Sequence, residues 1–252
     1  MVRPRIVLLG CATGIGNAGA RALAERGYAL ALGDIAREGV EALATDVRAQ
    51  GSRAHAFVVD AADPEAVRRF ADAAAAALGG LDAVWSNVGV QIAGRAEDVT
   101  AEQLDRSFAI NVRAHALLCG AAIPHLRAAG GGAILVTASN SALLSEPRLL
   151  PYATTKAAAL ALAKQMARDY SPEGIRVNAL CPGWVDTPFN TPAWENFGGR
   201  ERFLEAMPGL VPLGRISTPE EIARLACFLL SDEAAYVTGQ AFVADGGELL
   251  GG

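Results

Sequence analysis

Seven short apolar runs alternate with longer alanine-rich stretches along the chain, and this alternation constrains the fold more than any other feature. The runs occupy residues 5–9, 28–34, 54–60, 81–87, 132–139, 175–183 and 240–247. Continuously apolar strands are typical of a sheet buried on both faces, and connections of this length suit helical crossovers between parallel neighbours. We therefore predict an α/β fold with a doubly wound parallel sheet of about seven strands, helices on both faces, and a single domain over residues 1–252.

The stretches between these runs predict helices, and two of them begin with a recognisable capping pattern. Asp63-Pro64-Glu65 and Thr218-Pro219-Glu220-Glu221 each combine an N-cap residue, a proline in the first turn and an early carboxylate. The predicted helices cover residues 15–26, 38–50, 64–78, 101–128, 152–171 and 219–231.

Residues 187–215 depart from this pattern, with four prolines and four glycines in one segment. Segments of this length inside compact domains are often lids or binding loops. We expect a substrate-binding lid here, with an apolar wall built from Phe189, Trp194, Phe197, Phe203 and Met207, although such residues often serve only packing.

Charge and composition restrict the partners. A net charge of −5 with interspersed signs provides no basic stripe for nucleic acid and no polybasic cluster for a membrane surface. No apolar run approaches the roughly 18 residues of a membrane span. Four cysteines without C-x-x-C spacing and three scattered histidines predict no metal site and no disulfide framework. We expect a cytoplasmic protein with reduced thiols and a small-molecule partner.

The first apolar run leads into a turn with Gly10, Gly14 and Gly16. At the carboxyl end of the first strand, such a turn exposes backbone N–H groups and the positive end of a helix, which together suit a pyrophosphate. Glycines are common in ordinary turns, so this pattern alone leaves both interpretations open.

Asp34 ends the second run, 18 positions after Gly16, near the spacing at which an acid binds an adenosine ribose. A carboxylate there repels a 2′-phosphate, and neither Thr13 nor Ile35 supplies the cation that NADP would require. The sequence thus favours NAD, although Asp34 could instead cap a helix and the nearby Arg37 could weaken the preference.

Tyr152 and Lys156 are four positions apart, which places both side chains on one helix face. Only two of the 22 basic residues are lysines, so a lysine here departs from the chain's habit. An ammonium near a phenol favours the phenolate, and we expect a lowered pKa for Tyr152. An isolated Y-x-x-x-K pair is, however, more often a surface pair on a helix.

In ordered combination, these residues resemble the short-chain dehydrogenase/reductase family over the whole chain. The family's glycine pattern T-G-x-x-x-G-x-G matches residues 9–16 except that Leu9 replaces threonine, and its N-N-A-G segment corresponds to residues 86–89. Its P-G-x-V-x-T-P segment matches residues 182–188, and its serine matches Ser139, thirteen positions before Tyr152.

The resemblance implies a Rossmann-type fold and assigns roles to individual residues. The implied catalytic residues are Asn111, Ser139, Tyr152 and Lys156. The implied cofactor-binding residues are Gly10, Thr13, Gly14, Ile15, Gly16, Asp34, Asp60, Ala61, Asn87, Gly89, Tyr152, Lys156, Pro182, Gly183, Val185 and Thr187. The residues expected to contact substrate are Gln91, Ser139, Asn140, Tyr152 and Trp184.

The activity that the resemblance implies is NAD-dependent interconversion of a secondary alcohol and a ketone, with Tyr152 as general acid and base. Alternatives are a cis-dihydrodiol or hydroxysteroid-type dehydrogenase, a 3-oxoacyl thioester reductase, and a binding protein that senses NAD without catalysis. Arg148, Arg200 or Arg202 could bind a substrate anion, or could simply be exposed to water. The resemblance also implies a homo-oligomer, either a tetramer or a dimer.

Overall fold

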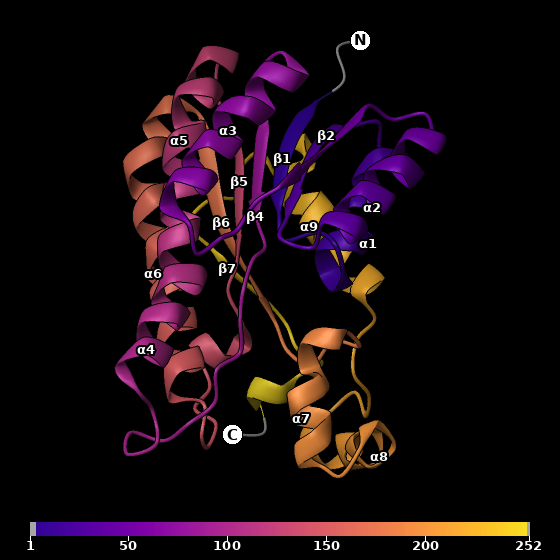
Figure 1. Ribbon diagram of the computed structural model, residues 1–252, viewed down its shortest axis with the longest axis vertical. Helices are drawn as coiled ribbons and strands as arrows, with labels where there is room; N and C mark the ends of the chain where they lie inside the picture. The colour runs from indigo at the N-terminus through magenta and orange to yellow at the C-terminus, as the bar shows by residue number, and fades with distance from the viewer. Residues whose placement is uncertain (1–3, 251–252) are drawn as a thin grey trace.

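The computed structural model describes residues 4–250, in which one parallel sheet lies between two layers of helices (Figure 1). The seven strands are ordered β3-β2-β1-β4-β5-β6-β7, and every neighbouring pair is parallel. This arrangement confirms the predicted Rossmann-type doubly wound sheet. The strands are β1 (Arg5–Leu9), β2 (Ala29–Asp34), β3 (Ala54–Val58), β4 (Ala83–Ser86), β5 (Gly132–Thr137), β6 (Ile175–Pro182) and β7 (Ala241–Ala244).

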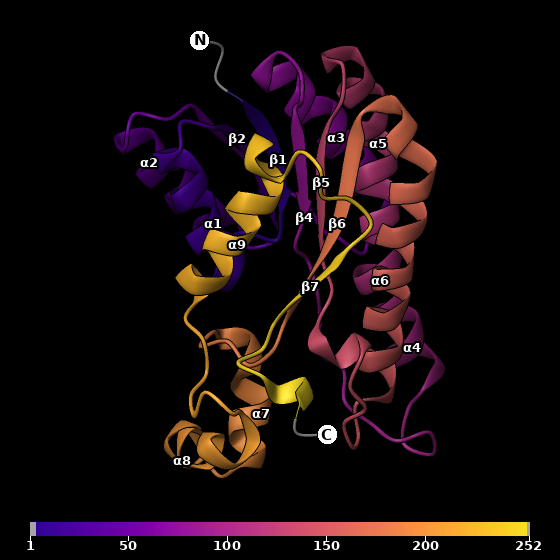
Figure 2. The same ribbon diagram turned by 180° about the vertical axis from the view of Figure 1, so that it is seen from behind.

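The helices divide between the two faces of the sheet, with α1, α2 and α9 on one face and α3, α5 and α6 on the other (Figures 1 and 2). The α-helices are α1 (Gly14–Glu25), α2 (Arg37–Ala49), α3 (Pro64–Leu78), α4 (Ala101–Phe108), α5 (Ala114–Ala129), α6 (Leu150–Tyr170), α7 (Thr191–Asn196), α8 (Arg200–Leu210) and α9 (Pro219–Leu230).

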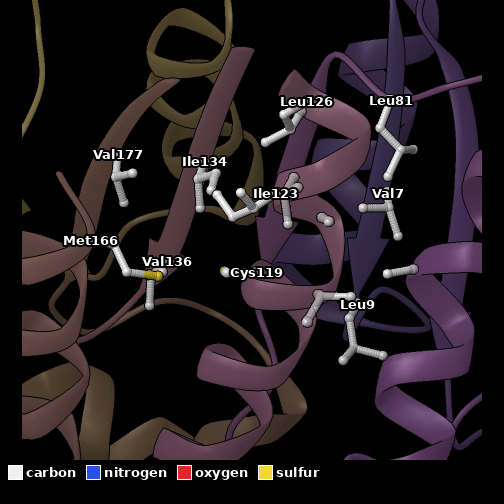
Figure 3. Packing of buried hydrophobic residues seen from close by; sticks show 14 of the residues in the cluster. Val7, Leu9, Leu81, Cys119, Ile123, Leu126, Ile134, Val136, Met166 and Val177 are labelled. Carbon is white, nitrogen blue, oxygen red and sulfur yellow. The ribbon is translucent and has the colours of Figure 1, made fainter. Parts of the chain in front are cut away.

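The side chains of β1 alternate between two cores. Val7 and Leu9 join the core beneath α3, α5 and α6, part of which is drawn in Figure 3, whereas Ile6 and Leu8 join the core beneath α1, α2 and α9. All four are fully buried. Because successive side chains of a strand point to opposite faces, a sheet covered on both faces needs an apolar residue at every position.

Both predicted capping patterns are present. The Asp63 carboxylate accepts hydrogen bonds from the backbone N–H groups of Glu65 and Ala66 at the start of α3. Thr218 and Glu221 form a reciprocal capping box at the start of α9. These caps satisfy N–H groups that have no partner within the helix, and they fix where each helix begins.

The predicted helix over residues 101–128 is present but is not a single regular α-helix. A π-helical turn over Ala109–Arg113 separates α4 from α5. Asn111 lies in this turn, and its side chain binds the backbone of Val90 and the hydroxyl of Thr155. A π-turn inserts an extra residue without ending the helical path, so the chain remains helical through residues 101–129 but changes register at Asn111.

Residues 187–215 contain α7 and α8, which the sequence analysis did not predict as helices. They lie beyond the carboxyl ends of the strands (Figures 1 and 2). Phe203 and Met207 are fully buried in a small separate core with Val211 and Ile216. The segment is therefore a compact unit rather than an open loop.

Within the described residues 4–250, no helix has the length and apolar character needed to cross a membrane. The same part of the chain contains no group of three or more His, Cys, Asp and Glu residues that could hold a metal ion. The four cysteines are buried and form no disulfide.

Candidate functional site

A cavity of about 360 Å³ lies at the carboxyl edge of the sheet. It opens where β1 and β4 are neighbours, because the connections that follow these two strands leave toward opposite sides of the sheet. Its wall combines the ends of β1, β2, β4, β5 and β6 with residues from the start of α6 and from residues 187–190. A parallel sheet brings such distant segments of the chain to one place.

The glycine turn forms one end of this cavity. Gly10 and Gly14 have φ values of +87° and +57°, a backbone region that favours glycine. A Cβ on Gly16 would lie 2.1 Å from the Gly10 carbonyl oxygen, so only glycine fits this position. Thr13, the N-cap of α1, makes no side-chain capping bond, which leaves the first N–H groups of the helix open to an anion.

Leu9 is accommodated because other residues connect the turn to β4. The Asn87 side chain donates to the Gly10 carbonyl oxygen at 2.7 Å and accepts from the Thr137 hydroxyl at 2.8 Å. The Asn87 backbone N–H also donates to the Leu9 carbonyl oxygen at 2.9 Å. The Leu9 side chain is fully buried and contributes to the core.

Asp34 lies at the end of β2 and lines the same cavity. Its carboxylate oxygens accept hydrogen bonds from the backbone N–H groups of Ala12 at 2.8 Å and Ala36 at 3.0 Å. Arg37 forms a salt bridge with Glu41 and is not among the described lining residues. The cavity therefore presents a carboxylate, without a paired arginine, at its β2 side.

The features of this end of the cavity fit a dinucleotide. The glycine cradle and the uncapped start of α1 suit a pyrophosphate, and the Asp34 carboxylate suits a ribose diol. Of the residues predicted to bind the cofactor, all line the cavity except Gly16, which lies behind the turn.

Ser139, Tyr152 and Lys156, the residues predicted to carry the chemistry, line the same cavity as the glycine turn. Each of them is at least nine-tenths buried. Ser139 follows β5, and the other two share one face of α6. The Lys156 ammonium lies 5.7 Å from the centre of the Tyr152 ring and donates to the Thr137 carbonyl oxygen at 2.9 Å. The burial of this pair excludes the interpretation of a solvated surface pair.

The expectation of a lowered pKa for Tyr152 is wrong for the protein alone. Burial raises the pKa of Tyr152 to about 12, and hydrogen bonding to Ser139 opposes that rise. Burial also lowers the pKa of Lys156 to about 8. Desolvation disfavours both charged forms, and here it outweighs the attraction between ammonium and phenolate that the spacing predicts.

Asn111 is completely buried beside the cavity and is not among its described lining residues. Its side-chain oxygen accepts from the Val90 N–H, and its amide nitrogen donates to the Val90 carbonyl and to Thr155. These bonds anchor the segment after β4 to α6. The catalytic role that the resemblance implies for Asn111 stays a prediction.

Two carboxylates near Ser139 were missed by the sequence analysis. Glu146 and Glu248 both line the cavity, and the Glu248 carboxylate accepts hydrogen bonds from Asn140 at 2.7 Å and from Trp184 at 3.0 Å. Burial and the neighbouring Glu146 raise the pKa of Glu248 to about 7. Neither residue belongs to a motif with a fixed spacing, so the sequence contains no signal for them.

The predicted substrate residues Gln91, Asn140 and Trp184 line the cavity together with Ser139 and Tyr152. From the aromatic set in residues 187–215, Phe189 lines it as well, with its ring centre 6.0 Å from that of Tyr152. The buried Phe203 and Met207 serve packing instead.

None of the three arginines considered for a substrate anion is among the described lining residues of this cavity. Arg148 lies 3.8 Å from the carboxylate of Asp98, and Arg200 binds Asp186 with two hydrogen bonds. The arginine that does line the cavity is Arg106 of α4, which the sequence analysis did not single out.

A doubly wound sheet with a glycine-rich turn and a buried Ser-Tyr-Lys set in one cavity defines a nicotinamide-dependent type of oxidoreductase. The chain belongs to the short-chain dehydrogenase/reductase family. The family described as enoyl-(acyl carrier protein) reductase matches residues 10–248.

Individual relatives cover almost the whole chain. D-threitol dehydrogenase from Mycolicibacterium smegmatis is 35% identical, over 96% of this chain and 91% of the relative. Cis-4-hydroxycyclohexanecarboxylate dehydrogenase from Sinomonas cyclohexanicum is 36% identical, over 96% and 94%. A short chain dehydrogenase from Burkholderia cenocepacia, solved in complex with NADP, is 32% identical with a TM-score of 0.90, over 98% and 99%.

Proposed function

We propose that this protein interconverts a secondary alcohol and a ketone with NAD, and that Tyr152 is the general acid and base. The observation that carries the proposal is the burial of Ser139, Tyr152 and Lys156 together in the cavity that also contains the glycine turn and Asp34. The dehydrogenases among the relatives support the same type of reaction.

When bound, a nicotinamide cofactor exchanges a hydride with the substrate carbinol carbon. The phenol of Tyr152 donates a proton to the ketone oxygen, and its phenolate removes the proton from the alcohol. The Ser139 hydroxyl holds the substrate oxygen as charge develops on it. Lys156 stabilises the phenolate and binds the nicotinamide ribose, whereas Thr187 and the Val185 backbone orient the carboxamide.

NAD rather than NADP is the proposed cofactor, although one similar structure contains NADP. The Asp34 carboxylate repels a 2′-phosphate, and Arg37 is engaged with Glu41. The remaining nucleotide contacts are those of the glycine turn and of Asp60, Ala61, Asn87 and Gly89, all of which line the cavity except Gly16.

The substrate is proposed to be a small alcohol or ketone enclosed by residues 187–215. Phe189 belongs to this segment and lines the cavity, which supports the proposal that residues 187–215 form a lid. The alternatives of a ring-alcohol dehydrogenase and a thioester reductase share the same catalytic residues. Enoyl reduction, although it appears in the family description, is disfavoured because that branch spaces its tyrosine and lysine further apart.

The decisive experiment replaces Tyr152 with phenylalanine and follows NADH absorbance with a panel of secondary alcohols. Tyr152→Phe should lower kcat by about 10²- to 10⁴-fold, because it removes the acid and base. NAD binding, measured by calorimetric titration, should persist. Tyr170→Phe at the end of the same helix is the matched control and should leave kcat within a factor of two.

The outcomes separate this proposal from its alternative. Unchanged turnover in Tyr152→Phe would refute the proposed mechanism. NAD binding without turnover of any alcohol or ketone in the native protein would instead favour the NAD-sensing binding protein.

A further inference from the structure

The part of the cavity next to Ser139 is acidic. Glu146 and Glu248, which we call the acidic pair, come from distant parts of the chain, one before α6 and the other after β7. Both are partly buried in the cavity wall. Placing two carboxylates beside a reacting centre requires compensation by hydrogen bonds or by a positive charge.

Each carboxylate accepts a hydrogen bond from one of the two residues that follow Ser139 in the sequence. Asn140, which is 4% exposed, donates to Glu248 at 2.7 Å, and Ser141 donates to Glu146 at 2.7 Å. The Asn140 side-chain oxygen in turn accepts from the Ser139 hydroxyl at 3.3 Å. The acidic pair is therefore fixed relative to the hydroxyl proposed to bind the substrate oxygen.

Neither carboxylate has a cationic partner. Across residues 4–250, no salt bridge involves Glu146 or Glu248. The cavity lining includes two cations, Lys156 near Tyr152 and the exposed Arg106 on α4. The mutual repulsion of the pair, together with burial, raises the pKa of Glu248.

Another polar group in the same cavity lacks a hydrogen-bond partner. The side-chain oxygen of Gln91 is buried and, among the described residues, accepts no hydrogen bond. Buried acceptors without donors are costly unless a ligand supplies the donor. Together with the acidic pair, Gln91 adds a buried acceptor to the wall of the cavity.

We propose that Glu146 and Glu248 select a substrate that carries hydrogen-bond donors beside its reacting carbon and no negative charge. This inference rests on the proposed function. A second hydroxyl or an ammonium group can supply the donors, and a carboxylate at the same place meets like charge. The substrate class is thus a vicinal diol or amino alcohol, or the corresponding ketone, and not a hydroxy acid.

The first test compares four matched substrates under NAD saturation: cyclohexanol, 1,2-cyclohexanediol, 2-aminocyclohexanol and 2-hydroxycyclohexanecarboxylate. The value of kcat/KM should be at least about tenfold higher for the diol or the amino alcohol than for cyclohexanol. It should be at least about tenfold lower for the hydroxy acid. The ratio between the diol and the amino alcohol identifies which donor the site takes.

The second test uses Glu248→Gln, which removes the charge and keeps the shape, with Glu233→Gln as an exposed control outside the cavity lining. The ratio of kcat/KM for amino alcohol to hydroxy acid should fall about tenfold or more in Glu248→Gln and stay constant in Glu233→Gln. A ratio within one variant cancels any common loss of activity or folded protein. Calorimetric titration with cyclohexylamine and cyclohexanecarboxylate should show the same change in binding.

Preference of the native protein for the hydroxy acid would overturn this inference and would indicate that Arg106 governs the cavity. Equal kcat/KM values for all four substrates would also overturn it while leaving the proposed dehydrogenase function intact. Absence of turnover with every alcohol and ketone would refute the proposed function itself.

Discussion

At the scale of single residues, Tyr152 and Lys156 show how burial controls the chemistry that a side chain can perform. Burial raises the pKa of Tyr152 to about 12 and lowers that of Lys156 to about 8. The position of both side chains on one helix face was predictable from the sequence, because four residues make about one helical turn. The direction of the tyrosine shift was not, since it depends on the depth of the pair in the folded chain.

This pKa predicts a pH profile that differs between the two directions of the reaction. Tyr152 is a phenol at neutral pH, and the fraction of phenolate rises about tenfold per pH unit below its pKa. The value of kcat/KM for alcohol oxidation should therefore rise steeply from pH 6 to pH 8. The range ends at pH 8 because the pKa of Lys156 is about 8, and its ammonium charge is lost above that value. For ketone reduction, which uses the phenol, it should change little. Stopped-flow rates at constant ionic strength test this, and a flat oxidation profile contradicts it.

Asp34 is the residue that we propose to determine a second property at this scale, the choice between NAD and NADP. Asp34→Asn removes the negative charge and keeps an oxygen that can accept from the Ala12 or Ala36 N–H. The ratio of kcat/KM for NAD to that for NADP should fall by about tenfold or more, because repulsion of the 2′-phosphate is lost. Asp46→Asn, on the exposed side of α2, is the control. An unchanged ratio in Asp34→Asn would show that another group discriminates against NADP.

At the scale of secondary-structure elements, the boundaries with local chemical causes were predictable. Asp63 and Thr218 cap α3 and α9 where the sequence analysis expected them. The π-turn around Asn111 was not, because Asn111 binds Val90 and Thr155, which are distant in the sequence, and no local pattern indicates these contacts. The helices of residues 187–215 were missed because prolines and glycines obscure their short periodicity.

The glycine turn gives a prediction at this scale. In Gly16→Ala, the new Cβ would lie 2.1 Å from the Gly10 carbonyl oxygen, which must move. We expect a loss of about 1–3 kcal/mol in the free energy of unfolding and at least tenfold weaker NAD binding. Urea denaturation and calorimetric titration measure the two effects.

Gly120 in α5 is the matched control for that substitution. A Cβ there meets no atom within 4 Å, so Gly120→Ala should raise the free energy of unfolding by up to about 1 kcal/mol through helix propensity. NAD binding should not change. Equal effects of the two substitutions would show that the close approach at Gly16 is unimportant.

At the scale of the whole molecule, the alternation of strands and helices was sufficient to predict the sheet. The cavity was only partly predictable. Residues in motifs, such as Gly10, Ser139 and Tyr152, were identified, whereas Glu146 and Glu248 were not. The two segments that carry them come together at this cavity only in the folded chain, and no local spacing indicates that arrangement.

Assembly beyond one chain is the remaining prediction at this scale. We expect a homo-oligomer, a tetramer or a dimer, and several large apolar side chains are exposed on the single chain, among them Tyr236 and Leu250. Sedimentation velocity at micromolar concentration should give a mass two or four times the chain mass of 26.0 kDa. A particle of 26.0 kDa at all concentrations would contradict this expectation.

The strand order has a consequence for how the protein is made. In the order β3-β2-β1-β4-β5-β6-β7, each new strand joins an outer edge of the strands synthesised before it. The sheet can therefore grow during translation, first on one side of β1 and then on the other, without opening a pair already formed. The glycine turn and Asp34 are made early in this sequence, whereas Glu248 of the acidic pair follows β7 and is added last.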